Sequence, residues 1–252
     1  MTFDVSGDAY DTFIGRYGRE LAPLFVDFAG IDAGTVLDVG CGSGILTEEL
    51  ASRLGAENVA AVDPSPLVDA CAARVPGADV RRGVAEALPW PVGSFDAALS
   101  QLVLHFLDDP VAGLVEMRRV TRPGGIVAAC SWNFDEMLLL RTFWRAARAV
   151  VPAAAAETLE LPSLEAFAEL GDRAGLADVE GAPLDVARTY EDFDELWDTF
   201  QLGVGPAGQF CVSLDPVSRS AIRDEYRRLI GEPDGSFELT AQAWALRGRV
   251  PT

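Results

Sequence analysis

The sequence predicts an α/β fold in which helices cover both faces of a mostly parallel sheet. Short apolar runs alternate along the chain with segments whose apolar residues recur at steps of three and four, the spacing of an amphipathic helix. The runs carry few polar residues, as expected of strands buried on both faces, and alternating strands and helices produce right-handed crossovers. We expect the 252 residues to form one large domain with a full core.

The first half of the chain shows this alternation most clearly. Helical patterns end at Gly30 and at Gly55, because glycine commonly follows the last turn of a helix. Ser65 and Pro66 are a favourable pair for opening a helix, and the glycines of TRPGG at 121–125 interrupt another. Strands are predicted at 35–40, 58–63, 79–84, 95–100 and 126–131, and helices at 45–54, 67–75 and 110–120.

After Trp132 the rhythm becomes less regular. We interpret 133–160 as helices that form a cap inserted after the fifth strand. We interpret Ser163 as the N-cap of a further helix. The stretch SFELTAQAWALRGR at 236–249 alternates apolar and polar residues, as a strand with one wetter face does. In this half, helices are predicted at 163–174, 193–200 and 217–230, and a strand at 179–186.

Charge and residue usage exclude several classes of protein. The formal net charge is −19, which argues against nucleic acid and membrane surfaces as partners. All 20 basic residues are arginine, so neither a Schiff-base lysine nor the lysine of a P-loop is available. No apolar run reaches the roughly 18 residues of a membrane helix. We therefore expect a cytoplasmic protein.

The cysteines and the histidine offer no obvious metal site. His105 is the only histidine, and Cys41, Cys71, Cys130 and Cys211 have no CxxC spacing. A zinc site built from cysteine and histidine at the usual spacings is therefore not expected. Free buried thiols in a reducing compartment fit better than disulfides.

The stretch TVLDVGCGSG ends the first predicted strand with glycines at Gly40, Gly42 and Gly44. Small residues at such a turn let backbone N–H groups and the following helix N-terminus approach a ligand. The dinucleotide fingerprint GxGxxG would need its third glycine where Ile45 stands. Asp38 adds a negative charge beside the turn. The ligand therefore need not carry a phosphate, and a cationic group is favoured.

Asp63 ends the second predicted strand, where a carboxylate can accept hydrogen bonds from both hydroxyls of a ribose. The alternative is that Asp63 only caps the turn that begins with Pro64. A ribosylated cation with an amino-acid tail fits the glycine turn, Asp38 and Asp63 together.

Four motifs resemble, in order and spacing, those of class I S-adenosylmethionine-dependent methyltransferases: VLDVGCGSG, AVDPS, AEALPWPVGSFDAALSQ and VTRPGG. They fall within 35–132, and AWALRG near the end resembles the last strand of the family. The most similar branch is the small-molecule type typified by ubiquinone and menaquinone biosynthesis enzymes. The resemblance implies a Rossmann-like sheet of seven strands, mostly parallel with an antiparallel last strand, and S-adenosylmethionine as the cofactor.

The resemblance also implies a cofactor-binding set. Its members are Asp38, Gly40, Cys41, Gly42 and Gly44 around the methionine part, Asp63 at the ribose, Pro64, Ala85 and Glu86 at the adenine, and Gln101 near the amino-acid end and the methyl group. The family often has an aspartate that bonds the adenine amino group where this chain has Val84. We therefore expect backbone groups alone to recognise the adenine.

The predicted single domain, 1–252, divides into parts that differ in role. The parts are 1–30, an N-terminal lid helix; 31–132, the cofactor-binding core; 133–160 and 190–230, helical cap and substrate elements; and 236–250, the last strand. The segment YDTFIGRYG at 10–18 resembles the lid of these enzymes, in which Arg16 or Tyr17 would reach the cofactor. The alternative is that Tyr17 packs in the helix and Arg16 faces solvent.

The acceptor side is the least readable part of the sequence. His105 follows the fourth predicted strand at the sheet edge where ligands bind, which makes it the candidate general base. Its apolar neighbours in LVLHFL equally fit a packed histidine. An aromatic wall for a planar acceptor, or ordinary core packing, is predicted for Phe13, Trp132, Phe134, Trp144, Trp197, Phe200 and Phe210.

The function predicted is in-line transfer of a methyl group from S-adenosylmethionine to a small hydrophobic or aromatic metabolite. The partners expected are this acceptor and, at most, a second copy of the chain, with no metal, nucleic acid or membrane. One alternative is a protein of this fold that binds S-adenosylmethionine without transferring the methyl, as a sensor or scaffold. The other is a nicotinamide oxidoreductase, against which Ile45 argues.

Overall fold

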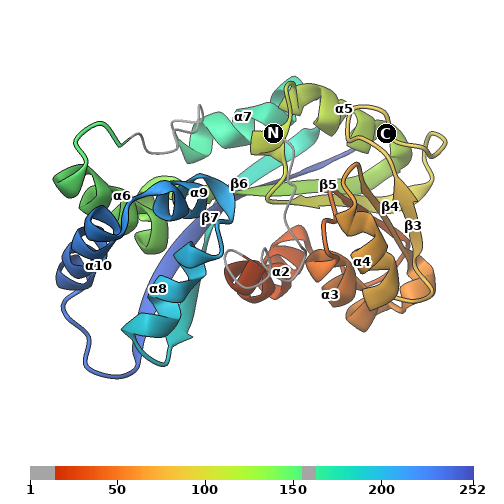
Figure 1. Ribbon diagram of the computed structural model, residues 1–252. Helices are drawn as coiled ribbons and strands as arrows, with labels where there is room; N and C mark the ends of the chain where they lie inside the picture. Colours follow the sequence, from red (N-terminus) through yellow and green to blue (C-terminus); the bar gives the residue numbers. More distant parts are fainter. Residues whose placement is uncertain (1–14, 155–162) are drawn as a thin grey trace.

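The computed structural model describes residues 15–154 and 163–252, and within them a seven-stranded sheet forms the centre of the molecule (Figure 1). The strand order is β3-β2-β1-β4-β5-β7-β6. β7 runs antiparallel to both of its neighbours, and the other strands share one direction. The predicted fold class is confirmed. The strands are β1 (Val36–Val39), β2 (Val59–Asp63), β3 (Asp79–Arg82), β4 (Phe95–Gln101), β5 (Thr121–Asn133), β6 (Ala177–Tyr190) and β7 (Phe237–Arg249).

Helices cover both faces of the sheet, and the sheet separates two hydrophobic cores. Along β1, Val36 belongs to the first core and Leu37 to the second, because successive side chains of a strand point to opposite faces. Every residue of β1 and β2 is buried, which explains their continuous apolar runs. The helices are α2 (Gly15–Ala29), α3 (Ile45–Leu54), α4 (Leu67–Arg74), α5 (Pro110–Val120), α6 (Leu138–Val150), α7 (Leu164–Arg173), α8 (Phe193–Gln201), α9 (Gly205–Ser213) and α10 (Pro216–Leu229).

Several helices begin where the sequence predicts. The Asp109 carboxylate accepts hydrogen bonds from the second and third backbone N–H groups of the first turn of α5, and Ser163 accepts one at the start of α7. Pro66, not Ser65 as predicted, occupies the N-cap position of α4. Ser65 Oγ nevertheless accepts a hydrogen bond from the backbone N–H of Leu67, the first residue of α4, at 3.3 Å, and its hydroxyl donates to Asp63.

The largest departures from the predicted elements lie in the second half. β5 and β6 are longer than the predicted strands 126–131 and 179–186, since β7 pairs with both along most of its length. α9 was not predicted. Its sequence GPAGQFCVS carries helix-disfavouring residues, and Gly208 is required there because a Cβ would stand 2.9 Å from the Gly203 carbonyl carbon.

Helices α6, α8, α9 and α10, here called the cap, lie together (Figure 1). They lie beside the last residues of β6 and the first residues of β7. Phe143 of α6 stacks on Phe200 of α8 with ring centroids 4.3 Å apart, and Trp144, Trp197 and other rings surround this pair. Trp144, Trp197, Phe200 and Phe210, expected to wall the acceptor site, thus pack together in the cap, as the alternative had it. Trp132 and Phe134 lie outside the cap and contact Tyr17 and His105. Phe13, residues 1–14 of the predicted lid and 155–160 of the predicted cap lie outside the described residues.

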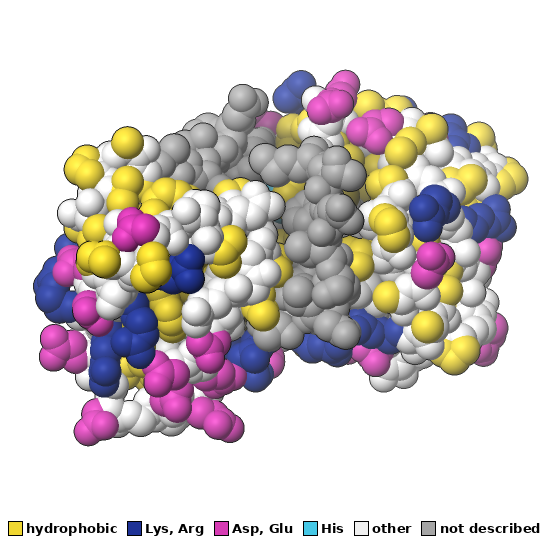
Figure 2. Space-filling view, viewed as in Figure 1, with side chains coloured by type: hydrophobic (Ala, Val, Ile, Leu, Met, Phe, Trp, Pro, Cys, Tyr) yellow, Lys and Arg dark blue, Asp and Glu magenta, His cyan; other side chains and the backbone are white. Residues whose placement is uncertain are grey.

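The surface carries acidic and basic side chains side by side over both halves of the molecule (Figure 2). In the cap, for example, Arg223 pairs with Asp194 and Arg228 with Glu225, so arginines lie among acids despite the net charge of −19. In the described part of the chain, no helix is both long enough and apolar enough to cross a membrane.

Candidate functional site

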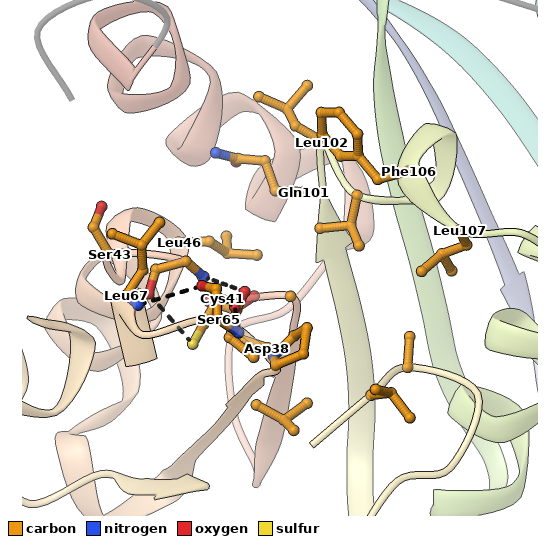
Figure 3. A pocket seen from close by; sticks show the side chains of 18 of the residues that line it. Asp38, Cys41, Ser43, Leu46, Ser65, Leu67, Gln101, Leu102, Phe106 and Leu107 are labelled. Carbon is orange, nitrogen blue, oxygen red and sulfur yellow. Dashed lines mark hydrogen bonds between the residues drawn. The ribbon is translucent and has the colours of Figure 1, made fainter. Parts of the chain in front are cut away.

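A cavity of about 640 Å³ opens at the carboxyl ends of β1, β2 and β4 (Figure 3). In open α/β sheets this edge, next to the point where the strand order reverses, is where ligands bind. The strand order reverses here, because β2 and β4 lie on opposite sides of β1. The cavity volume lies in the range that holds a ligand of nucleoside size.

The three glycines of the turn after β1 have positive φ angles and different surroundings. A Cβ on Gly40 would stand 2.3 Å from a methyl carbon of Val103, and one on Gly44 would stand 2.9 Å from Cys71 Sγ. A Cβ on Gly42 would meet nothing within 4 Å, and Gly42 lines the cavity whereas Gly44 is not among its lining residues. Gly42 is therefore the glycine at which a ligand can come close to the backbone.

The protein itself uses most N–H groups of this turn. Gly40 N and Cys41 N donate to Val62 O of β2, at 2.8 and 3.0 Å. Gly42 N donates to Asp63 Oδ2 at 2.9 Å, and Gly44 N to Cys41 O at 2.8 Å. These bonds hold the turn against β2. Because these N–H groups are already bonded within the protein, a ligand can contact the open surface of the turn but does not use them as donors.

Asp38 lies at the bottom of the cavity with 1 % of its surface exposed. Its Oδ2 accepts a hydrogen bond from Thr47 Oγ1 at 2.6 Å, whereas Oδ1 is buried and has no partner among the described residues. The pKa of this carboxyl is raised to about 7, chiefly by burial. The hydrogen bond from Thr47 opposes the shift, and the nearby Asp63 carboxylate contributes to it. A cationic group would supply the missing partner and favour the ionised form.

Asp63 joins the turn after β1 to the turn after β2. Its Oδ2 accepts from Gly42 N at 2.9 Å, and its Oδ1 accepts from Ser65 N at 2.8 Å and from the Ser65 hydroxyl. The turn-capping alternative is thus part of its role. Each carboxylate oxygen can accept two hydrogen bonds, so Oδ2 retains capacity for a ligand hydroxyl.

The remaining predicted residues of the cofactor set also line the cavity. They are Pro64, Ala85, Glu86 and Gln101, together with Cys41 and Gly40. Val84 lines it as well and is 45 % exposed. Gln101 Nε2 donates to Gly18 O of α2 at 3.1 Å, while its Oε1 has no partner among the described residues.

Arg16 and Tyr17 do not line the cavity. Tyr17 is fully buried, and its hydroxyl accepts a hydrogen bond from Tyr190 at 3.2 Å. Arg16 forms an ion pair with Glu195 of α8. The two side chains tie α2 to β6 and to the cap, so the packing alternative holds for Tyr17 and neither predicted reading describes Arg16.

His105 also stays out of the cavity lining, although the three residues after it belong to the lining. Its Nδ1 lies 3.0 Å from Ser131 Oγ of β5, and its ring contacts Phe134. Burial lowers its pKa to about 4, so the imidazole is neutral at physiological pH. This geometry matches the packed-histidine alternative better than a general base.

Several cavity residues were not singled out from the sequence. Leu102 follows β4 with φ +64, a left-handed conformation that a leucine rarely adopts and that no sequence signal announces. Gly15 and Gly18 of α2 line the cavity, and two glycines in an otherwise amphipathic helix were a readable signal. The other unanticipated lining residues include Leu67, Val103, Phe106, Leu107 and Asp108.

A cofactor of the predicted kind fits these residues. The buried Asp38 oxygen without a partner suits an ammonium group, and Gly42 leaves room for a ligand against the backbone. Asp63 retains an acceptor position for a ribose hydroxyl. Within the described residues, no group of three or more His, Cys, Asp or Glu side chains could hold a metal ion.

Comparison with known proteins identifies relatives of this chain. A methyltransferase-domain family model matches residues 37–129. The malonyl-[acyl-carrier protein] O-methyltransferase of Halorhodospira halophila is 28 % identical over 268 residues, covering 98 % of this chain and 87 % of that protein. The ubiquinone biosynthesis O-methyltransferase of Cereibacter sphaeroides is 35 % identical over 130 residues, or 47 % of each chain.

Among solved structures, the [4+2]-cyclase SpnF has the same fold, with a TM-score of 0.56 and 16 % identity over 100 % of this chain and 87 % of that one. At this identity the likeness concerns the fold alone. The matched motifs, the sheet order and the cavity at the carboxyl ends of the strands agree with one another. A methyltransferase domain thus occupies residues 37–129, and the chain is similar along nearly its whole length to an O-methyltransferase.

Proposed function

We propose that this protein transfers the methyl group of S-adenosylmethionine to a small, apolar or aromatic acceptor. The observation that carries the proposal is the unpartnered Oδ1 of Asp38, a buried carboxylate oxygen in the same cavity as the glycine turn and Asp63. A buried acceptor without a partner costs stability. A ligand with a cationic amino-acid tail and a ribose offsets that cost, because its ammonium group pairs with Asp38 and a ribose hydroxyl donates to Asp63.

Each residue of the site has a proposed task. The cofactor supplies an electrophilic methyl group on a sulfonium, and the protein supplies alignment and a dry surrounding. Asp38 binds the ammonium group, Gly42 accepts the methionine part against the backbone, and Asp63 binds the ribose. Pro64 and Ala85 flank the adenine, with Glu86 beside them and backbone groups in place of a side chain at Val84.

The acceptor enters at the Gln101 end of the cavity. Leu102 and Phe106 lie near Gln101 and supply apolar surface (Figure 3), and Gly18 of α2, next to Gln101 and Leu102, has no side chain. Such a wall suits a flat, apolar molecule. Because His105 bonds to Ser131 and is not a lining residue, we propose that it has a structural role.

The proposal extends to partners and location. The acidic surface disfavours nucleic acid, so the expected partners are the acceptor and, at most, a second copy of the chain. All four cysteines are buried and free, which suits the reducing cytoplasm.

A second candidate function has one observation in its favour. SpnF, which has this fold, is described as a [4+2]-cyclase, so the fold alone does not determine the reaction. On this alternative the protein holds S-adenosylmethionine without transferring its methyl group.

Calorimetric titration with S-adenosylmethionine and S-adenosylhomocysteine, followed by product analysis, tests the proposal. We expect both ligands to bind at about micromolar concentrations. With S-adenosylmethionine and a panel of phenols and hydroquinones, we expect a methylated product and S-adenosylhomocysteine as the by-product. Failure of both ligands to bind would sink the cofactor assignment. Binding of both with no S-adenosylhomocysteine produced from any acceptor would favour the second candidate.

Asp38 makes cofactor binding dependent on pH. The ionised form binds the ammonium group, and its pKa in the free protein is about 7. The association constant should therefore fall by up to roughly tenfold per unit as the pH drops below about 7. Titration of Asp38→Asn should show weaker binding without this slope, whereas Asp108→Asn, a matched charge change at the cavity mouth, should keep it.

The same pKa shift sets the sign of a stability effect. The raised pKa stabilises the folded protein fully below 3.8, and this contribution is lost as the pH rises through about 7. Without ligand, the melting temperature of Asp38→Asn should thus gain on that of the native chain between about pH 5 and 8. An equal pH dependence of the two melting curves would contradict the burial argument.

Asp63→Ala should weaken S-adenosylhomocysteine binding by more than about tenfold through loss of a charged acceptor. Because Asp63 also holds the turn, a double-mutant cycle with a 2′,3′-dideoxy analogue of the ligand separates the two effects. If Asp63 binds the ribose, the variant should no longer distinguish the analogue from the parent ligand. Additive losses would mean that Asp63 only supports the turn.

His105→Gln should change turnover by less than about threefold, because the imidazole does not line the cavity and its pKa of about 4 makes it a weak base. Initial rates and S-adenosylhomocysteine affinity are the two measurements, and Ser131→Ala is the matched control that removes the other side of the contact. A large fall in turnover at unchanged affinity in His105→Gln alone would assign the base to His105.

A further inference from the structure

Two buried cysteines lie together behind the glycine turn. Cys41 of the turn and Cys71 of α4 form a small cluster with Ala61 and Val68, separate from the two main cores. Gly44 touches both residues. Its N–H donates to the backbone oxygen of Cys41 at 2.8 Å, and a Cβ on it would stand 2.9 Å from Cys71 Sγ. The missing side chain at Gly44 therefore leaves room for Cys71 beside the turn that carries Cys41.

The two thiols differ in access and in their contacts. Cys41 lines the cavity and is 8 % exposed, whereas Cys71 is fully buried. Cys71 Sγ lies 3.4 Å from Thr47 Oγ1, which donates to Asp38. A hydrogen bond from the Cys41 thiol, supported by Thr47, lowers the pKa of the Cys71 thiol, and the same contact together with burial raises the pKa of Cys41.

We propose that Cys41 and Cys71 form an intramolecular disulfide when a peroxide enters the cofactor-free pocket, and that this bond abolishes tight cofactor binding. The Cys41 sulfur attacks one peroxide oxygen, the O–O bond breaks, and the thiol proton passes to the departing oxygen, so that a sulfenic acid forms as the first water leaves. The Cys71 sulfur then attacks the sulfenic sulfur and expels the hydroxyl group as a second water. Two thiols lose two protons and two electrons, and the peroxide is reduced to water.

The bond would distort the cofactor site through contacts already described. Disulfide sulfurs are separated by about 2.05 Å, so the turn after β1 must move toward α4. Gly42 shares that turn and is bonded to Asp63, and Thr47 contacts both Cys71 and Asp38. This consequence rests on the proposed function of the pocket, whereas the disulfide itself does not.

Tryptic mapping detects the bond directly, because the chain is cut only at arginine and each cysteine falls on its own peptide. Cys41 lies on residues 20–53 and Cys71 on residues 54–74. After hydrogen peroxide treatment and a non-reducing digest, we expect these two peptides linked, lighter than their sum by two hydrogen atoms. S-adenosylhomocysteine present during the treatment should prevent the link by covering Cys41.

A binding measurement tests the second part of the proposal, the loss of cofactor affinity after oxidation. The oxidised protein should bind S-adenosylhomocysteine at least about tenfold more weakly, and dithiothreitol should restore the affinity. Cys71→Ser should bind like the native chain before treatment and lose little affinity after it. Cys211→Ser, which removes a buried thiol of the cap instead, should respond to peroxide as the native chain does.

The outcomes separate the disulfide from its consequence. Unmodified thiols, Cys41 oxidised without a link, or a link to another cysteine would each overturn the thiol pair, and the map of the native chain decides this even if Cys71→Ser does not fold. A linked pair with unchanged affinity would overturn the effect on the pocket. A linked pair in a protein whose reduced form binds no S-adenosylhomocysteine would instead overturn the proposed function.

Discussion

The hydrogen bond from Gly42 N to Asp63 Oδ2 connects the two turns on which the whole site is built. It joins the loop after β1 to the loop after β2, and the bonds from Gly40 N and Cys41 N to Val62 O lie beside it. A turn with three positive φ angles is costly in conformational entropy. Its attachment to the central strands offsets this cost, and the site inherits the rigidity of the sheet.

Asp38 shows that the site works against the stability of the fold. A buried carboxylate with one oxygen unpartnered is destabilising in the absence of ligand, and the left-handed Leu102 next to the same cavity adds strain. Both residues line the cavity. Function and stability therefore compete at the carboxyl ends of β1 and β4.

The sequence was sufficient to predict the parallel strands and several residues that line the cavity, because these depend on local signals: apolar runs, glycines at fixed spacing, and Asp63 at a strand end. The reversed last strand and the remaining lining residues followed from the family resemblance. The directions of side chains on α2 and η2 (Leu104–Phe106) were not predictable, because one residue of helical offset turns Tyr17 or His105 away from the cavity. The cap rings were ambiguous for another reason. Aromatic residues have the same sequence signature in a core as in a binding wall, and only the stacking of Phe143 on Phe200 decides between them.

Helix α2 has two faces with separate duties. Gly15 and Gly18 face the cavity, while Arg16 and Tyr17 hold β6 and the cap. The aromatic core of the cap and the glycine turn share no residue, and α2 is the described element that reaches both. Substitutions in the core of the cap can thus accumulate without touching the glycine turn, provided that the cap still fits the outer face of this one helix.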